Sequence, residues 1–183
     1  MTCILTHSGK LFNFKAPNLH KYDIREIAHA LSNLGRFTGH TSRFYSVAQH
    51  SVAVSYIVPE RLALAALMHD ASEAYLGDVA SPLKALLPEY KYIEEQTECA
   101  IARAFAIRNL YPLHPDIKWA DMVALRHERE AYLAEAKDDL DWPALIPIPA
   151  NAEATILATY TPAFAKEVFL RRYDALLEGG TEP

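Results

Sequence analysis

The stretch Leu62–Lys84, LALAALMHDASEAYLGDVASPLK, is the most informative part of this sequence. Its first residues, 62–68, are apolar and have the composition of a buried helix. The next sixteen residues contain one histidine, three acids and a lysine. A charged side chain buried without a partner costs several kcal/mol. The adjacent His69 and Asp70 therefore predict a compensating group, and a metal ion is the usual candidate.

Helical periodicity extends this argument to a second acid. We expect one continuous helix over residues 60–76. Residues three and four apart share a helix face, so His69, Asp70 and Glu73 would lie on the stripe that continues the core position Leu62. One buried stripe would thus change from apolar to ionisable halfway along the helix.

Two other predicted helices present an ionisable group on an apolar face. His50 lies on the apolar stripe of VAQHSVAVSYIV, residues 47–58, and Asp121 lies on that of DIKWADMVAL, residues 116–125. Together with His69 and Asp70 they make two imidazoles and two carboxylates aimed at the interior. This donor set suits a divalent ion such as Zn, Co, Mn, Fe or Ni. Glu73 and Asp78 would then orient a water molecule or move its protons.

The whole chain predicts a mainly α fold with about six or seven helices and a small N-terminal β-hairpin around Ser8-Gly9. At 183 residues we expect a single domain. Asp23 followed by Glu26 has the pattern of a capping box at the first helix. Ser46, Ser81 and Thr161 are expected to cap the helices that follow them. The expected helices cover residues 24–34, 47–58, 60–76, a segment starting at Ser81-Pro82, 89–107, 116–136 and 162–178, with a Pro-rich loop over 141–151.

Composition excludes some classes of protein. The net charge of −5 argues against a general nucleic-acid binder. Cys3 and Cys99 are far apart and are interpreted as reduced thiols. The sequence has no apolar signal segment at its start and no apolar run long enough to span a membrane. We therefore expect a cytoplasmic protein that does not bind membranes.

Four segments resemble the HD-domain phosphohydrolases, in particular the 5′-deoxynucleotidase branch and its phage dATP triphosphohydrolase relatives. MHDASEAYLGDVASPLK, residues 68–84, has the HD pair followed by Glu, Gly-Asp and a Ser-Pro-x-Lys turn. YSVAQHSVAVS, residues 45–55, is similar to the helix with the first metal histidine. KWADMVALRHE, residues 118–128, is similar to the helix with the last aspartate. LGRF, residues 34–37, matches the phosphate-binding arginine and its aromatic neighbour.

The resemblance implies an HD-domain helical bundle and a role for each candidate residue. His50, His69, Asp70 and Asp121 would bind the metal, and Glu73 and Asp78 would be catalytic. The substrate would contact Arg36, Phe37, Lys84 and Lys118, the last placed there by its position one helical turn before Asp121. A second ion such as Mg²⁺ would accompany the substrate.

The implied activity is removal of 5′-phosphates from deoxynucleotides, with a dNTP, and dATP first, as the favoured substrate. A 5′-deoxynucleotidase acting on dNMPs, an HD phosphodiesterase or alarmone hydrolase, and a non-catalytic nucleotide sensor are the alternatives. The family implies a homo-oligomer, a dimer or a hexamer. His127-Glu128 begins like an HExxH zinc helix, but Ala131 stands where the second histidine would be, so we assign this pair no role.

Overall fold

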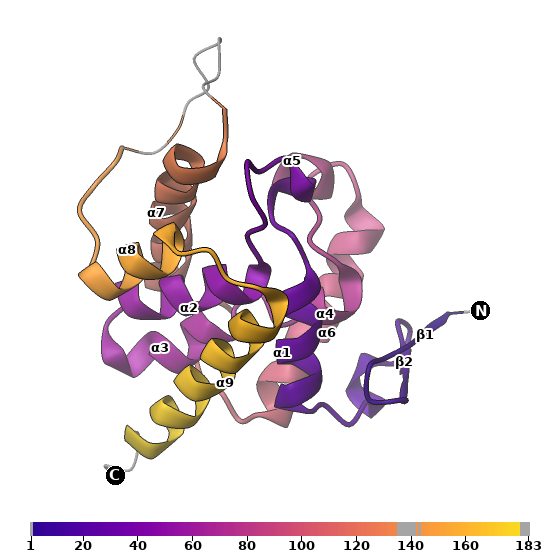
Figure 1. The fold of residues 1–183 in the computed structure, drawn as a ribbon. Helices are drawn as coiled ribbons and strands as arrows, with labels where there is room; N and C mark the ends of the chain where they lie inside the picture. The colour runs from indigo at the N-terminus through magenta and orange to yellow at the C-terminus, as the bar shows by residue number, and fades with distance from the viewer. Residues whose placement is uncertain (1, 135–141, 143, 180–183) are drawn as a thin grey trace.

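A computed structural model describes residues 2–134, 142 and 144–179. These residues form a mainly helical protein with a two-stranded antiparallel sheet near the N-terminus (Figure 1). The strands are β1 (Cys3–Leu5) and β2 (Leu11–Asn13), and the 3₁₀ turns are η1 (Pro17–Leu19) and η2 (Phe37–Gly39). The α-helices are α1 (Ile24–Asn33), α2 (Val47–Ile57), α3 (Glu60–Leu67), α4 (Glu73–Leu76), α5 (Ser81–Lys84), α6 (Pro88–Ala104), α7 (Pro115–Tyr132), α8 (Ala150–Leu157) and α9 (Pro162–Gly179).

The mainly α prediction with an N-terminal hairpin is confirmed. The described residues contain nine α-helices rather than six or seven. The helix not expected at all is α8, which begins at Ala150 inside the segment interpreted as a Pro-rich loop. Its first helical residue follows Pro149 directly, and a proline is well tolerated at the start of a helix. Residues 141 and 143 of that expected loop lie outside the described residues.

The hairpin is fixed by its turn and by one buried ring. Leu5 pairs with Leu11 and Ile4 with Phe12, and the Thr6 N–H donates to the Lys10 carbonyl at 2.8 Å. Phe12 is fully buried, whereas Leu5 and Leu11 are exposed. Only one side of the two-stranded sheet therefore packs against the helical body.

Helix α2 lies at the centre of the protein (Figure 1) and packs against α1, α3, α7, α8 and α9. It is buried on every side from Val47 to Ser55, as expected for a helix enclosed by others. The predicted cap is confirmed, since the Ser46 hydroxyl accepts from the Gln49 N–H at 3.2 Å. A central, enclosed helix makes any polar side chain on it, such as His50, part of the interior.

The predicted continuous helix over 60–76 is wrong. Helix α3 ends at Leu67. Turns whose backbone hydrogen bonds join residues three apart connect it to α4. The His69 Nδ1 bonds the Ala66 carbonyl at 2.8 Å, which is the acceptor that a continuing helix would offer to the next turn. His69, Asp70 and Glu73 therefore do not form one helical stripe. The turn places them instead.

Two predicted helix starts are also corrected. Asp23 caps α1 by accepting from the Arg25 N–H at 2.8 Å, but Glu26 does not complete a capping box because its carboxylate is bound elsewhere in the core. Ser81 is the first residue of α5 rather than its cap, which is Ala80. The Thr161 cap before α9 is confirmed by a bond from the Phe164 N–H at 3.2 Å.

The remaining helix ends differ by a few residues from those expected. Helix α6 ends at Ala104, three residues early, and Ala106 beyond it has a positive φ of 53°. Helix α7 ends at Tyr132, and positions 135 and 136 of the expected helix lie outside the described residues. Both cysteines are free. Within the described part of the chain, no helix is both long and apolar enough to cross a membrane.

Candidate metal centre and adjoining cavity

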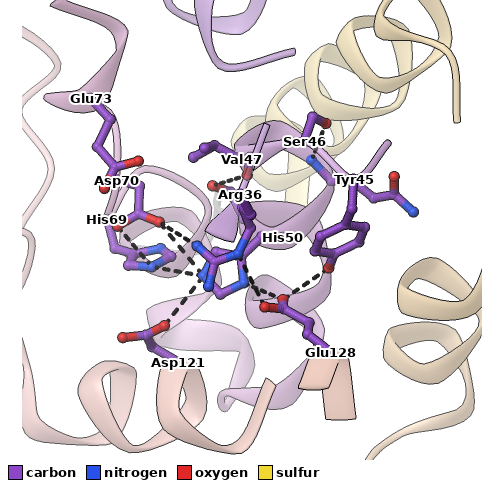
Figure 2. Close-up of polar contacts among 12 residues, drawn as sticks. Arg36, Tyr45, Ser46, Val47, His50, His69, Asp70, Glu73, Asp121 and Glu128 are labelled. Carbon is purple, nitrogen blue, oxygen red and sulfur yellow. Dashed lines mark hydrogen bonds and ion pairs between the residues drawn. The ribbon is translucent and has the colours of Figure 1, made fainter. Parts of the chain in front are cut away.

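Three separate segments bring four side chains to one point. His50 comes from α2, Asp121 from α7, and His69 and Asp70 from the turn after α3 (Figure 2). The His50 Nε2 lies 3.3 Å from the His69 Nε2, 3.3 Å from an Asp121 oxygen and 3.6 Å from an Asp70 oxygen. The His69 Nε2 lies 3.1 Å from the other Asp70 oxygen. The structure therefore brings together all four predicted metal ligands.

Hydrogen bonds at the two Nδ1 atoms fix how the imidazoles of His50 and His69 face each other. The His69 Nδ1 donates to the Ala66 carbonyl at 2.8 Å, since a carbonyl can only accept. The His50 Nδ1 lies 2.5 Å from a Glu128 oxygen. Both Nε2 atoms are consequently turned inward. With both rings neutral, two acceptor nitrogens and two carboxylates would repel one another there. A cation at their centre removes that repulsion, so this donor set fits a divalent metal ion.

The electrostatics of the cluster favour positive charge at the same point. Burial and the nearby Arg36 disfavour a charged His50, but Glu128 and Asp121 outweigh them and raise the His50 pKa to about 9. Burial opposes ionisation of Asp70 and Asp121 as well. The surrounding histidines nevertheless hold the pKa of both carboxyl groups well below their usual range. Both acids stay ionised and available as ligands.

Glu128 is the important residue that the sequence analysis missed. It is fully buried and accepts from the Tyr45 hydroxyl at 2.9 Å and from the Arg36 Nε at 3.0 Å, besides contacting His50. It thus orients one ligand of the predicted metal and one predicted substrate residue (Figure 2). The comparison with an HExxH helix was misleading. The useful signal was its spacing of seven residues from Asp121, which places both acids on one face of α7.

A cavity of about 380 Å³ opens beside the cluster. Its wall contains eight of the ten predicted site residues and leaves out the two histidines. These eight are Arg36, Phe37, Asp70, Glu73, Asp78, Lys84, Lys118 and Asp121. Met122, Leu125 and Trp142 provide an apolar part of the same wall. Polar and apolar groups therefore share one cavity of a size suited to a small molecule.

Glu73 and Asp78 lie in this wall in surroundings that disfavour their charged forms. Glu73 is 6% exposed, and one of its oxygens is buried without a hydrogen-bond partner among the described residues. Burial, together with Asp70 and Asp78, raises the Glu73 pKa well above its usual value. Burial also raises the Asp78 pKa, and Asp70 adds to this while Arg36 opposes it. Perturbed carboxyl groups in a cavity are typical of proton-transfer sites.

The three predicted phosphate-binding cations differ in their surroundings. Arg36 is buried, with its NH1 3.8 Å from Asp70. The Lys84 ammonium is bound by Glu94 at 2.6 Å and lies 3.6 Å from Glu73. Lys118 is mostly exposed and pairs with Asp121 at 3.0 Å. Each cation therefore faces a carboxylate of the site.

The loop that follows Arg36 is conformationally strained. Phe37 and Thr38 have φ values of 55° and 54°, in the left-handed region that most residues avoid. The Arg36 guanidinium lies over the Phe37 ring, 5.5 Å from its centroid. Both Phe37 and Thr38 line the cavity. Strain of this kind costs of order 1 kcal/mol per residue and is concentrated at functional sites.

Comparison with known proteins shows the family of this chain but assigns it no activity. The chain is 40% identical over 178 residues to the uncharacterized protein YfdR of Escherichia coli (strain K12), and the match covers 97% of each protein. It is 30% identical over 182 residues to the uncharacterized protein RCAP_rcc00048 of Rhodobacter capsulatus, covering 93% of each. No family model matches. The chain belongs to the family of these two proteins.

Proposed function

We propose that this protein is a metal-dependent phosphohydrolase of the HD type that removes 5′-phosphates from deoxynucleotides. The observation that carries the proposal is one cavity wall that contains Asp70 and Asp121, two protonatable acids and three cations. The two histidines of the cluster lie outside this wall but within 3.6 Å of these aspartates. Metal, proton donor and phosphate-binding cations are the components that phosphoryl transfer requires. The resemblance of residues 45–55, 68–84 and 118–128 to HD phosphohydrolases supports the same reading.

The residues that would hold the metal are His50, His69, Asp70 and Asp121. A divalent ion held there supplies Lewis-acid polarisation of a phosphoryl oxygen and lowers the pKa of water. Nitrogen and carboxylate donors suit Zn, Co, Mn, Fe or Ni, and a second ion such as Mg²⁺ would arrive with the nucleotide.

The chain's own acids would manage the protons. Glu73 has a raised pKa because it is buried near Asp70 and Asp78, so it keeps its proton to higher pH and can donate it to the leaving oxygen. Asp78 also has a raised pKa, chiefly through burial, which makes its carboxylate a stronger base toward the attacking water. The two acids thus have complementary roles at one end of the cavity.

The cations would bind and orient the phosphates. Arg36 and Lys84 would balance phosphate charge in the cavity that Met122 and Leu125 also line. Lys118 is the outermost cation, suited to a distal phosphate of a triphosphate. We propose a dNTP, dATP first, as the substrate. Phe37 would contact the base or sugar. We further propose that the enzyme acts in the cytoplasm as a homo-oligomer.

An assay that detects released phosphate, pyrophosphate and triphosphate tests this proposal. The panel contains dNTPs, NTPs, dNMPs, NMPs and an alarmone, each with Co²⁺, Mn²⁺ or Zn²⁺. Wild type is compared with Asp70→Ala, which removes a ligand, and with Asp174→Ala, which removes an exposed acid on α9. Glu73→Ala is added because it should keep the metal and lose turnover.

The outcomes separate the competing functions. Metal-dependent turnover of dATP above the other substrates, lost in Asp70→Ala and kept in Asp174→Ala, supports the proposal. Turnover of dNMPs alone indicates a 5′-deoxynucleotidase, and turnover of the alarmone alone indicates an alarmone hydrolase. A protein that binds metal and nucleotide without any turnover is a sensor, and that result refutes the enzymatic proposal.

A further inference from the structure

A buried carboxylate outside the cavity connects three parts of the fold. Glu26 on α1 is 3% exposed and accepts hydrogen bonds from the Tyr75 hydroxyl at 2.8 Å and the Thr6 hydroxyl at 2.6 Å. It also accepts from the Ser8 hydroxyl and lies 2.8 Å from the His20 Nε2. These partners come from the hairpin turn, the segment after η1 and helix α4. Such a fully bonded buried acid fixes the relative positions of the segments that supply its donors.

Helix α4 is the segment whose position depends most on its hydrogen bond to Glu26, which we call the anchor. It contains only four residues, Glu73–Leu76, and the side chain of its N-cap residue Ser72 makes no capping hydrogen bond. A helix of one turn is not stable by itself, because its nucleation is unfavourable. The position of α4 must therefore come from tertiary contacts.

Tyr75 makes the contacts that anchor α4. Its ring is 4% exposed and stacks on Phe12 with ring centroids 4.5 Å apart, while its hydroxyl donates to Glu26. Two residues earlier in the same turn, Glu73 lines the cavity. Residues two apart point to different sides of a helix. Thus α4 has Tyr75 against the hairpin and Glu73 against the cavity.

We infer that Glu26 is a positioning residue for Glu73, acting through the Tyr75 hydroxyl. This inference rests on the proposed function of the cavity and adds the hairpin and α1 to the parts that determine its activity. Loss of the Tyr75–Glu26 bond lets α4 shift or rotate, and Glu73 moves with it. Displacements of about 1 Å can reduce turnover by about a hundredfold, so even a partial shift is measurable.

The test compares two variants that each delete one tyrosine hydroxyl. Tyr75→Phe keeps the ring on Phe12 and removes only the bond to Glu26. Tyr22→Phe is the matched control, because Tyr22 packs against Tyr75 in the same aromatic cluster but donates to the Pro17 carbonyl at 3.0 Å. Glu26→Gln weakens the same anchor from its other end, because a neutral amide oxygen is a weaker acceptor than a carboxylate.

We expect Tyr75→Phe to lower kcat about tenfold or more, with KM and metal stoichiometry unchanged. The kcat–pH profile should move to lower pH, because a Glu73 less enclosed by protein ionises more easily. Hydrogen exchange at the Gly77 amide, which donates to the Glu73 carbonyl at 2.8 Å, should become faster. Glu26→Gln should show the same three changes, and Tyr22→Phe none of them.

Each other result counts against the inference in a distinct way. If Tyr75→Phe has the same kcat, pH profile and Gly77 exchange as wild type, the inference is overturned and the phosphohydrolase proposal stays intact. Changes in Tyr75→Phe that Glu26→Gln does not share would show that Glu26 is not the anchor. A wild-type protein without turnover overturns the proposed function and, with it, the catalytic meaning of this anchor.

Discussion

Replacing Glu128 by glutamine should weaken metal binding although Glu128 is not a ligand. Its carboxylate is fully buried and is shared by the His50 Nδ1 at 2.5 Å, the Arg36 Nε at 3.0 Å and the Tyr45 hydroxyl at 2.9 Å. Glutamine has almost the same shape but no charge. The change therefore removes the charge that orients His50 while disturbing the packing very little.

The expected size of the effect follows from these contacts. All three are charge-assisted, because the acceptor is an ionised carboxylate, and such bonds contribute about 1.5–3 kcal/mol each. Breaking a buried ion pair from one side costs about 3–5 kcal/mol, because the remaining charge is left unpaired. Glutamine keeps one oxygen as an acceptor, so we expect the free energy of unfolding to fall by about 3 kcal/mol, the lower end of this range. Loss of a group that orients a metal-bound histidine typically weakens metal affinity about 10–100-fold.

Two measurements on purified protein check this prediction. Metal affinity is obtained by titration against a competing chelator, and the free energy of unfolding is measured with the metal removed. Glu130→Gln is the matched control, because Glu130 lies two residues further along α7 and is paired with Arg126 and Arg129 near the surface. Tyr45→Phe removes only the bond from the neutral donor and should cost about 1.5–3 kcal/mol. If Glu128→Gln bound metal as tightly as Glu130→Gln, our account of the His50 orientation would be refuted.

Two further predictions concern stability. Adding Zn²⁺ or Mn²⁺ at about a hundred times its Kd should stabilise the wild type by about 2.7 kcal/mol, which is measured as a rise in Tm. His50→Gln should lose this rise, and the exposed control His40→Gln should keep it. An equal rise in both variants would place the metal elsewhere. Although burial opposes its ionisation, hydrogen bonds from Ser8, Thr6, His20 and Tyr75 lower the Glu26 pKa from 4.5 to about 2, so its contribution is complete above pH 4.5 and is lost as the pH falls toward 2. Acid unfolding curves should show this loss in wild type and a smaller one in Glu26→Gln, and identical slopes would contradict it.

Local patterns were sufficient where neighbours along the chain determine the outcome. The hairpin around Ser8-Gly9, the Ser46 cap of α2 and the Thr161 cap of α9 follow from turn and capping chemistry. Helical periodicity also placed His50 on a buried face correctly. These features depend on contacts within a few residues, which a sequence displays directly.

Local patterns failed at three places, once through contacts distant in sequence and twice through local features that the patterns do not display. Glu26 has the spacing of a capping box, but its carboxylate is bound by donors from the hairpin and α4 instead. The helix expected over 60–76 breaks because the His69 side chain bonds the Ala66 carbonyl. Helix α8 begins directly after Pro149, inside a segment whose prolines indicated a loop.

The sequence by itself determined the residue types of the candidate site: two histidines and two aspartates on apolar segments, and acids and cations in a short motif after them. Only the tertiary structure decided how they meet. The turn after α3, rather than a helical stripe, brings His69 and Asp70 to His50, and α7 adds Asp121. The tertiary structure also revealed Glu128, whose importance depends on its distance from Arg36 and His50. The physical reason is that charge interactions and hydrogen bonds depend on separation in space, whereas periodicity reports only which face of an element a residue occupies.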